Sequence, residues 1–372
     1  MRQRIVVKVG TSTLTNGTSR LHRQTMLNIV HQLAHLHQGG HEVVLVSSGA
    51  QAVGREVLNF PEISKALPAK QMLSAVGQSR LMQLYADLFG IFELTVAQIL
   101  LTRDDLSHRT RYLNARDTLR TLLEHRLIPI INENDTIATE EIRVGDNDNL
   151  SALVASALEA DTLVILTDQD GLYTANPRTH PDATLIPLVA HLDDSIFALA
   201  GGVGTKVGTG GMTTKLQAAQ VATRSGVAVV IANGRVPAVL TRLIEGGERI
   251  GTRFEPSSTH LESRKRWILT ERPQGTVQID AGATQALRTR QGASLLPVGI
   301  TRLNGAFKRG AVISVLTPDG KPLAHGLSNY DSGQLQLIMG KQSSQIADIL
   351  GFTYGDEAVH RNNLVVLDSP QA

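Results

Sequence analysis

Short apolar runs alternate with longer amphipathic segments along the first 255 residues of the chain. The runs are rich in β-branched residues and hydrophobic over nearly their whole length, which is typical of strands buried on both faces. The longer segments carry apolar residues at helical spacing. Strands and helices that alternate in this way predict an α/β fold with a mainly parallel sheet. We predict strands at residues 5–9, 43–46, 127–131, 163–166 and 227–231, and helices at 23–37, 69–88, 109–124 and 213–225.

The pattern changes near residue 275, where short alternating segments separated by turn residues replace the longer units. This change is typical of a small, mostly β domain. The Pro-Ser-Ser-Thr stretch at residues 256–259 indicates a linker before it. We predict strand-like segments in the second domain at 276–279, 300–303, 312–316 and 335–338. The predicted domain limits are 1–256 for the first domain, 257–274 for the linker, 275–353 for the mostly β domain and 354–372 for a C-terminal tail.

Each predicted strand of the first domain ends in small or polar residues. Gly10-Thr11-Ser12 follow the first strand, and Ser47-Ser48-Gly49 follow the second. The other three run into residues 132–135, 167–168 and 232–234. One such turn is common, because polar and glycine-rich turns often connect a strand to a helix. Five of them predict a shared binding edge, because ligands bind outside the carboxyl ends of the strands in open α/β sheets.

Composition narrows the classes of function. The chain has 372 residues, 42% hydrophobic and 19% charged, with a net charge of +2. This near balance gives no sign that the chain as a whole binds nucleic acid or a membrane. The absence of cysteine excludes disulfides, thiolate metal sites and a cysteine nucleophile. The N-terminal apolar run is too short for a signal peptide or a membrane span, so we expect a cytoplasmic protein.

A glycine-rich segment predicts a phosphate site. Residues 208–215 read Gly-Thr-Gly-Gly-Met-Thr-Thr-Lys and lead directly into a predicted helix. Glycines let successive backbone N–H groups crowd around an anion, and the helix N-terminus adds unsatisfied donors and partial positive charge. Lys215 adds a full charge. The spacing matches neither a Walker A loop nor the dinucleotide-binding fingerprint.

Two further charged features complete a candidate chemistry. Lys8 lies inside an otherwise apolar strand, where an unpaired charge is costly to bury. Residues 145–151, Gly-Asp-Asn-Asp-Asn-Leu-Ser, begin a helix with more Asp and Asn than capping needs, and they do not fit the EF-hand pattern. Two lysines, an aspartate and glycine amides suit phosphoryl transfer, in which catalysis is mostly positioning and charge neutralisation. If a carboxylate accepts the phosphoryl group, it is already ionised at neutral pH, so the reaction needs no general base.

The histidines do not change this interpretation. His31, His35, His37 and His41 cluster around the first predicted helix, and His31 and His35 share a face. No carboxylate stands at a supporting spacing. We therefore interpret them as solvated helix residues and assign no residue to a metal.

Together these residues resemble the amino-acid kinase family, and most closely its glutamate-phosphorylating branch. The segments that carry the resemblance are 7–12, 47–50, 75–78, 113–116, 131–135, 144–150, 166–168, 171–173 and 208–215. The C-terminal part is similar to a PUA domain at 279–283, 294–300 and 309–310. The resemblance implies a three-layer α/β/α sandwich with a mainly parallel sheet, followed by a small, mostly β PUA-like domain.

The resemblance also implies roles for individual residues. Lys8 and Lys215 would stabilise the transferring phosphoryl group, and Asp148 would orient both lysines. Gly10 and Gly49 would offer backbone donors. Glutamate would be held by Ser48, Gly49, Asp135 and Asn147, with Asp135 a partner for its α-ammonium. The residues expected to bind ATP are Lys8, Gly10, Thr167, Asp168, Thr209, Gly210, Gly211, Met212, Thr213, Thr214 and Lys215.

The implied reaction transfers phosphate from ATP to the side-chain carboxylate of L-glutamate, which is the first step of proline biosynthesis. Mg²⁺ would be held largely by the nucleotide phosphates and water. L-proline is the expected inhibitor, a homodimer or homotetramer the expected assembly, and glutamyl-phosphate reductase a further partner.

Two rival functions remain open from the residues. One is another activity of the same family, on acetylglutamate, aspartate or a nucleoside monophosphate; the PUA-like domain and the Asn-Glu-Asn-Asp string at 132–135 argue against it. The other is RNA binding through the PUA-like domain and the basic run Arg264–Arg266. The balanced charge and few aromatic residues weaken that reading, and we expect no membrane partner.

Overall fold

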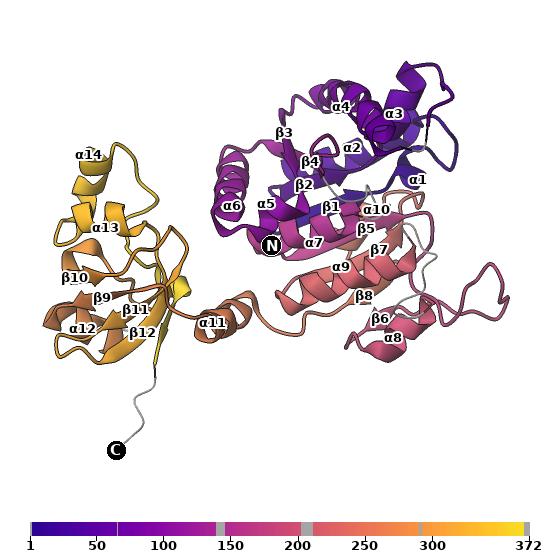
Figure 1. The fold of residues 1–372 in the computed structure, drawn as a ribbon. Coiled ribbons are helices and arrows are strands. Elements are labelled where there is room, and N and C mark those ends of the chain that lie inside the picture. Colours follow the sequence, from indigo (N-terminus) through magenta and orange to yellow (C-terminus); the bar gives the residue numbers. More distant parts are fainter. Residues whose placement is uncertain (1, 65, 139–145, 202–210, 290–291, 368–372) are drawn as a thin grey trace. The chain divides into compact units, whose positions relative to one another are not determined.

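A computed structural model describes residues 2–64, 66–138, 146–201, 211–289 and 292–367. The chain forms two compact units, Met1–Thr259 and His260–Ala372. Each unit has a sheet of its own (Figure 1). The predicted α/β fold followed by a mostly β domain is confirmed.

The sheet of the first unit has the strand order β3-β4-β2-β1-β5-β7-β8-β6. Its central strands run parallel, with Lys8 of β1 opposite Val46 of β2 and Ile165 of β5. The only antiparallel pair among its described strands is β7 with β8. The strands are β1 Arg4–Val9, β2 Glu42–Ser47, β3 Val96–Leu101, β4 Ile128–Glu133, β5 Thr162–Thr167, β6 Leu188–Val189, β7 Ala228–Asn233 and β8 Thr252–Phe254.

Helices cover both faces of this sheet, so that the unit has three layers (Figure 1). Alternate residues of one strand face opposite cores: Val6 packs with one helical layer, and Ile5 and Val7 pack with the other. Helices α6 (Arg109–Glu124), α7 (Asp146–Leu158) and α9 (Met212–Arg224) cover the first face. Helices α2 (Arg23–Gln38), α4 (Leu67–Gly90) and α10 (Val239–Ile244) cover the second. The shorter helices of the unit are α1 Thr11–Leu14, α3 Ala50–Val57, α5 Arg103–Ser107 and α8 Asp194–Leu199.

Close packing of α3 against the first half of α4 fixes the two helices beside the segment that follows β2. A Cβ on Gly77 would lie 1.8 Å from the carbonyl oxygen of Ala50, and one on Gly54 would lie 2.0 Å from that of Leu73. Only glycine at these two positions allows the two helix backbones to touch. Helix α4 is therefore held against the segment that follows β2.

The five strands and four helices predicted for the first unit are confirmed, with ends that differ by a few residues. Strand β3 was not predicted, because it lies at the sheet edge and its residues are only partly buried. The interpretation of the histidines as solvated is wrong for two of the four. His37 and His41 are buried, and desolvation lowers the pKa of His37.

The second unit contains a sheet in the order β10-β9-β11-β12-β13. Its helices are α11 His260–Thr270, α12 Ala281–Thr289, α13 Ser332–Ile338 and α14 Ile346–Leu350, and short 3₁₀ turns lie at Pro297–Gly299, Ser343–Gln345 and Arg361–Asn363. Its strands are β9 Gly275–Ile279, β10 Ile300–Asn304, β11 Val312–Leu316, β12 Pro322–Leu327 and β13 Leu364–Val366.

Residues 335–338 are helical, so the prediction of a strand-like segment there is wrong. Asp331 caps helix α13 by a reciprocal pair of hydrogen bonds with Gln334, a capping box that the apolar pattern conceals. Helix α11 occupies part of the span for which the sequence predicts a linker, and its Ile268 packs with Val312 and Leu327. Strand β13 lies within the span predicted as a tail. Among the described residues, no helix is both long and apolar enough to cross a bilayer.

Candidate functional site

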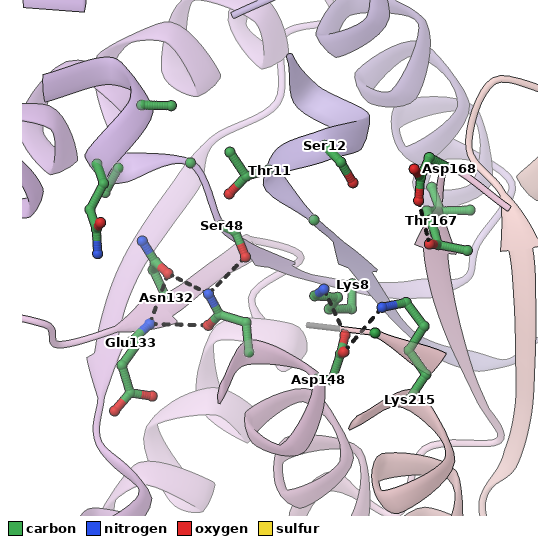
Figure 2. Close-up of a pocket in the computed structure, with 18 of the residues that line it drawn as sticks. Lys8, Thr11, Ser12, Ser48, Asn132, Glu133, Asp148, Thr167, Asp168 and Lys215 are labelled. Atoms are coloured by element: carbon green, nitrogen blue, oxygen red, sulfur yellow. Dashed lines mark hydrogen bonds and ion pairs between the residues drawn. The ribbon is translucent and has the colours of Figure 1, made fainter. Parts of the chain in front are cut away.

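A cavity of about 700 Å³ opens where the central strands of the first unit end. Residues that follow β1, β2, β4 and β5 line it, together with the first residues of α7 and α9. This is the edge that the polar strand ends predict, and the parallel register is the reason: it brings all of their carboxyl ends to one side. Figure 2 shows three groups across the cavity, with Ser48, Asn132 and Glu133 on one side, Lys8, Asp148 and Lys215 in the middle, and Thr167 and Asp168 on the other.

The middle group is a buried charge cluster. Nζ of Lys8 lies 2.6 Å from Oδ1 of Asp148, and Nζ of Lys215 lies 3.3 Å from Oδ2 of the same carboxylate. Asp148 is fully buried, and the two lysines are 5% and 6% exposed. Three elements far apart in sequence, β1, α7 and α9, thus place their charges together (Figure 2). Two ammonium groups against one carboxylate leave one net positive charge at the centre of the cavity.

The charges of this cluster are strongly coupled. Burial alone would raise the pKa of Asp148, but the positive charges of Lys8 and Lys215 and hydrogen bonds from Lys8 and Thr214 outweigh it and hold that pKa below its usual range. Burial and the neighbouring charge of Lys8 lower the pKa of Lys215, although Asp148 opposes the change. Asp148 is therefore the fixed anion of the cluster, and Lys215 is a lysine whose proton is held less firmly than in water.

Thr214 joins the start of α9 to this cluster. Its hydroxyl lies 2.8 Å from Oδ2 of Asp148 and 2.9 Å from the carbonyl oxygen of Gly211. Thr213, its neighbour, instead donates to the carbonyl of Ala200. Neither threonine lines the cavity, whereas Gly211, Met212 and Lys215 do. The predicted ATP-binding residues Thr209 and Gly210 lie outside the described residues.

Two glycines bring backbone close to the same centre. A Cβ on Gly10 would lie 3.3 Å from Nζ of Lys8, so a side chain there would crowd the ammonium. Gly49 has a φ of 107°, a backbone conformation that residues other than glycine rarely adopt. Both residues line the cavity, and the family resemblance implies that they offer backbone donors there.

On one side of the cluster, amide side chains form a hydrogen-bonded network. Nδ2 of Asn147 donates to Oγ of Ser48 at 2.9 Å and to Oδ1 of Asn132 at 3.0 Å. Asn132 in turn donates to Oε1 of Gln78 at 2.7 Å. The structure thus brings the predicted residues Ser48 and Asn147 together, and Asn147 links Ser48 to Asn132, which lie on the same side of the cavity (Figure 2).

Asp135 lies on the same side and lines the cavity. Its Oδ2 accepts a hydrogen bond of 2.6 Å from Oγ of Ser74 on helix α4. Burial raises the pKa of Asp135, and hydrogen bonds from Ser74 and Gln51 offset part of that rise. A half-buried carboxylate with this environment suits a cationic ligand, which would replace the hydration that it has lost.

Thr167 and Asp168 face the cavity from the other side of the cluster. The Thr167 hydroxyl donates to Oδ1 of Asp168 at 3.2 Å, and Arg178 lies 3.5 Å from Oδ2. Arg178 is exposed at the rim, and it lies in a segment whose sequence pattern predicts no role.

Several other lining residues were not singled out from the sequence. Thr11 and Ser12 directly follow β1, so the strand-end pattern carried a signal for them. Lys70 and Gln51 lie on helices, where the sequence pattern carries no signal for a binding role. Among the described residues, no group of three or more histidine, aspartate or glutamate side chains could hold a metal ion. Three of the lining carboxylates, Asp148, Asp168 and Asp135, are engaged with protein donors or cations.

Comparison with known proteins identifies a family for each of the two units. The model of the amino acid kinase family matches residues 3–233, and that of the PUA domain matches residues 275–350. Glutamate 5-kinase of Deinococcus radiodurans is 54% identical over 98% of this chain and 100% of that protein. Glutamate 5-kinase of Herpetosiphon aurantiacus is 55% identical over 98% of each chain. The solved structure of UMP kinase from Bacillus anthracis aligns with a TM-score of 0.49 and 14% identity, over 69% of this chain and 97% of that one.

Identity above half over nearly the full length of both chains exceeds anything that a shared fold alone requires. The chain therefore belongs to the amino acid kinase family, within which it groups with the glutamate 5-kinases, and it carries a C-terminal PUA domain.

Proposed function

We propose that this protein transfers the terminal phosphoryl group of ATP to the side-chain carboxylate of L-glutamate, giving L-glutamyl 5-phosphate and ADP, the first step of proline biosynthesis. The observation that carries the proposal is the convergence of Lys8 and Lys215 on Asp148 between two differently built sides of one cavity. Amides and a carboxylate form one side, and Thr167 and Asp168 form the other. Full-length identity to glutamate 5-kinases supports the same acceptor.

The cluster suits the charge distribution of the transfer. An oxygen of the glutamate carboxylate forms a bond to the terminal phosphorus, and the bond from phosphorus to the bridging oxygen of ADP breaks. ADP leaves with that electron pair. The transferred group carries negative charge throughout, and the one net positive charge of the cluster lies where that charge must be neutralised. Asp148 keeps the two ammonium groups close together without cancelling both charges.

The acceptor chemistry explains why no general base is needed. A carboxylate is ionised at neutral pH and attacks without losing a proton. Lys8 and Lys215 would contact phosphate oxygens, and Gly10 and Gly49 would add backbone donors. Ser48 and Asn147 would orient the glutamate, and Asp135 would bind its α-ammonium. Thr167, Asp168 and the start of α9 would hold the nucleotide.

Mg²⁺ is part of the proposal as the ion that nucleotide phosphates carry, and it would shield their negative charge. The engaged state of the lining carboxylates supports an ion held by phosphate oxygens and water.

Inhibition by L-proline, a homodimer or homotetramer, contact with glutamyl-phosphate reductase and a cytoplasmic location belong to the proposal as well. Proline shares the α-amino acid head of glutamate, so Asp135 could hold either molecule. Inhibition should then be relieved by glutamate. Proline inhibition that glutamate leaves unchanged would place the inhibitor at a separate site.

ADP release with a panel of acceptors tests the function. We expect turnover with L-glutamate and trapping of the acyl phosphate by hydroxylamine as the hydroxamate. N-acetylglutamate, aspartate and uridine monophosphate serve as the rival acceptors. Turnover with one of these rivals but not with glutamate would move the chain to a different activity of the family.

A further inference from the structure

Helix α4 turns a row of polar side chains toward the acceptor side of the cavity. Ser74 donates to Asp135 at 2.6 Å, Gln78 accepts from Asn132 at 2.7 Å, and Gln71 donates to the carbonyl of Ala138 at 3.3 Å. Positions 70, 74 and 78 follow each other at four-residue spacing, so they share one face of the helix. Ser74 does not line the cavity, although the carboxylate that it holds does. This face of α4 therefore supports the acceptor side from behind.

Lys70 stands one turn before Ser74 on this face, and it lines the cavity together with Asp135. It is half-buried, and among the described residues its ammonium group makes no ion pair or hydrogen bond. The other lysines and arginines that line the cavity are engaged: Lys8 and Lys215 contact Asp148, and Arg178 lies near Asp168 on the nucleotide side. On the acceptor side, Lys70 is thus the cation that remains available among the described lining residues.

The proposed acceptor has three charged groups, and the residues discussed so far account for two. Its side-chain carboxylate belongs at the cluster, and its α-ammonium belongs at Asp135. The α-carboxylate also leaves water when it enters the cavity, and an unpaired buried carboxylate is costly. A cation one helical turn from the residue that holds Asp135 can supply the missing partner.

We propose that Lys70 binds the α-carboxylate of the acceptor, and that Ser74 is a positioning residue that holds Asp135 toward the α-ammonium. This assignment rests on the proposed function and extends it. Lys70 and Asp135 then form a complementary pair that recognises an α-amino acid by its two head charges. The cluster around Asp148 recognises the reacting end separately, so that head recognition and chemistry lie on different elements.

An acceptor without the α-carboxylate charge tests Lys70 directly. L-isoglutamine keeps the reactive side-chain carboxylate and the α-ammonium, and its α-carboxyl is a neutral amide. In the parent protein we expect its KM to exceed that of L-glutamate. Lys70→Met should raise the KM for L-glutamate about 10- to 100-fold, the range for one charge-assisted hydrogen bond. It should change the KM for L-isoglutamine by less than about threefold. Lys70→Arg should recover part of the loss with glutamate.

The possible outcomes distinguish a wrong assignment of Lys70 from a wrong proposed function. An equal rise of KM for both acceptors in Lys70→Met would overturn the assignment of Lys70 while leaving the kinase function intact. A parent protein that does not phosphorylate L-glutamate would overturn the proposed function and the assignment together. Thermal unfolding of each variant, with ATP present, distinguishes a loss of binding from a loss of folding.

Ser74 has a matched control on its own helix. Ser79 is exposed, and its hydroxyl is 3.4 Å from the carbonyl of Val76 within α4. Ser74→Ala should raise the KM for glutamate about 5- to 10-fold, less than the loss expected at Lys70 because Ser74 acts only through Asp135, with kcat and the KM for ATP little changed. The Ser74 hydrogen bond lowers the pKa of Asp135, and only the ionised form of Asp135 attracts the α-ammonium of the acceptor. The KM for glutamate should rise as the pH falls, and loss of this hydrogen bond should shift that rise to higher pH. Ser79→Ala should do neither. An unmoved pH profile in Ser74→Ala would remove Ser74 from the positioning role.

Discussion

Nζ of Lys8 lies 2.6 Å from Oδ1 of Asp148, and this contact between two buried side chains joins the first strand of the sheet to the start of helix α7. A second lysine, Lys215, shares the same carboxylate. The arrangement keeps a surplus positive charge in a buried place, which is costly without an anion. In the proposed reaction, a polyphosphate that binds in the cavity would offset that cost, so the charge cluster favours binding of the nucleotide.

The first prediction concerns Lys215. Lys215→Met should lower kcat about 100- to 1,000-fold, because a charge that neutralises the transferring group is lost. The KM for glutamate should change much less, since its head binds elsewhere. Steady-state kinetics measured by ADP release checks this. Lys321→Met, at a lysine that is 81% exposed in the second unit, is the control and should leave kcat unchanged. A kcat close to that of the parent would exclude Lys215 from the mechanism.

The second prediction concerns Asp148. Asp148→Asn leaves two buried ammonium groups without their counter-charge, and we expect the free energy of unfolding to fall by about 3–5 kcal/mol. Urea denaturation at neutral pH measures it. The exposed pair of Asp319 with Lys321 gives the comparison, and Asp319→Asn should lower the free energy of unfolding far less, because solvent screens an exposed pair.

The pH dependence of stability gives a further check on Asp148. Its pKa is lowered in the folded protein, so its contribution to stability is present above the ordinary value of 3.8 and is lost as the pH falls through the lower folded value. Asp148→Asn should abolish this acidic loss. Equal stability losses in Asp148→Asn and Asp319→Asn would mean that the cluster is not a buried, mutually dependent unit.

The third prediction concerns the pH dependence of acceptor binding. Burial raises the pKa of Asp135, and only its ionised form attracts an ammonium group. The KM for glutamate should therefore rise as the pH falls through a value above 3.8, the ordinary pKa of this side chain, while the KM for ATP stays nearly constant. Asp135→Asn should show a high KM for glutamate at every pH, without this rise. Parallel changes in both KM values would indicate a general effect on the fold instead.

The fourth prediction separates the two units. All described residues that line the cavity belong to the unit Met1–Thr259. A protein that ends at Thr259 should therefore keep ATP-dependent phosphorylation of glutamate, with its oligomeric state and its response to proline free to change. The isolated second unit should have no kinase activity, and any RNA binding should be weak and sensitive to salt. Tight, sequence-selective RNA binding at physiological salt, with no turnover of any amino acid by the full chain, would favour the RNA-binding alternative.

Much of the fold follows from local patterns. The five central strands are continuous apolar runs because both of their faces are covered, and such runs are visible without any tertiary information. The edge strand β3 escapes this reading because one face meets solvent and its apolar residues are interrupted. Helix α13 escapes it for a different reason: its capping box decides the conformation, and the apolar spacing of residues 335–338 fits either state.

The residues alone indicate which chemical groups this protein offers. Lys8 and Lys215 stand out as charges in apolar or glycine-rich surroundings, Asp148 lies in an unusually Asp- and Asn-rich helix start, and the polar strand ends indicate the edge at which they meet. Their partners depend on the fold. The fold places both lysines on one carboxylate, links Ser48 to Asn132 through Asn147, and brings Lys70 and Ser74 of α4 to the acceptor side. The physical reason is that a lysine or serine on a helix looks ordinary in sequence, because its environment is made by elements that reach it only when the chain folds.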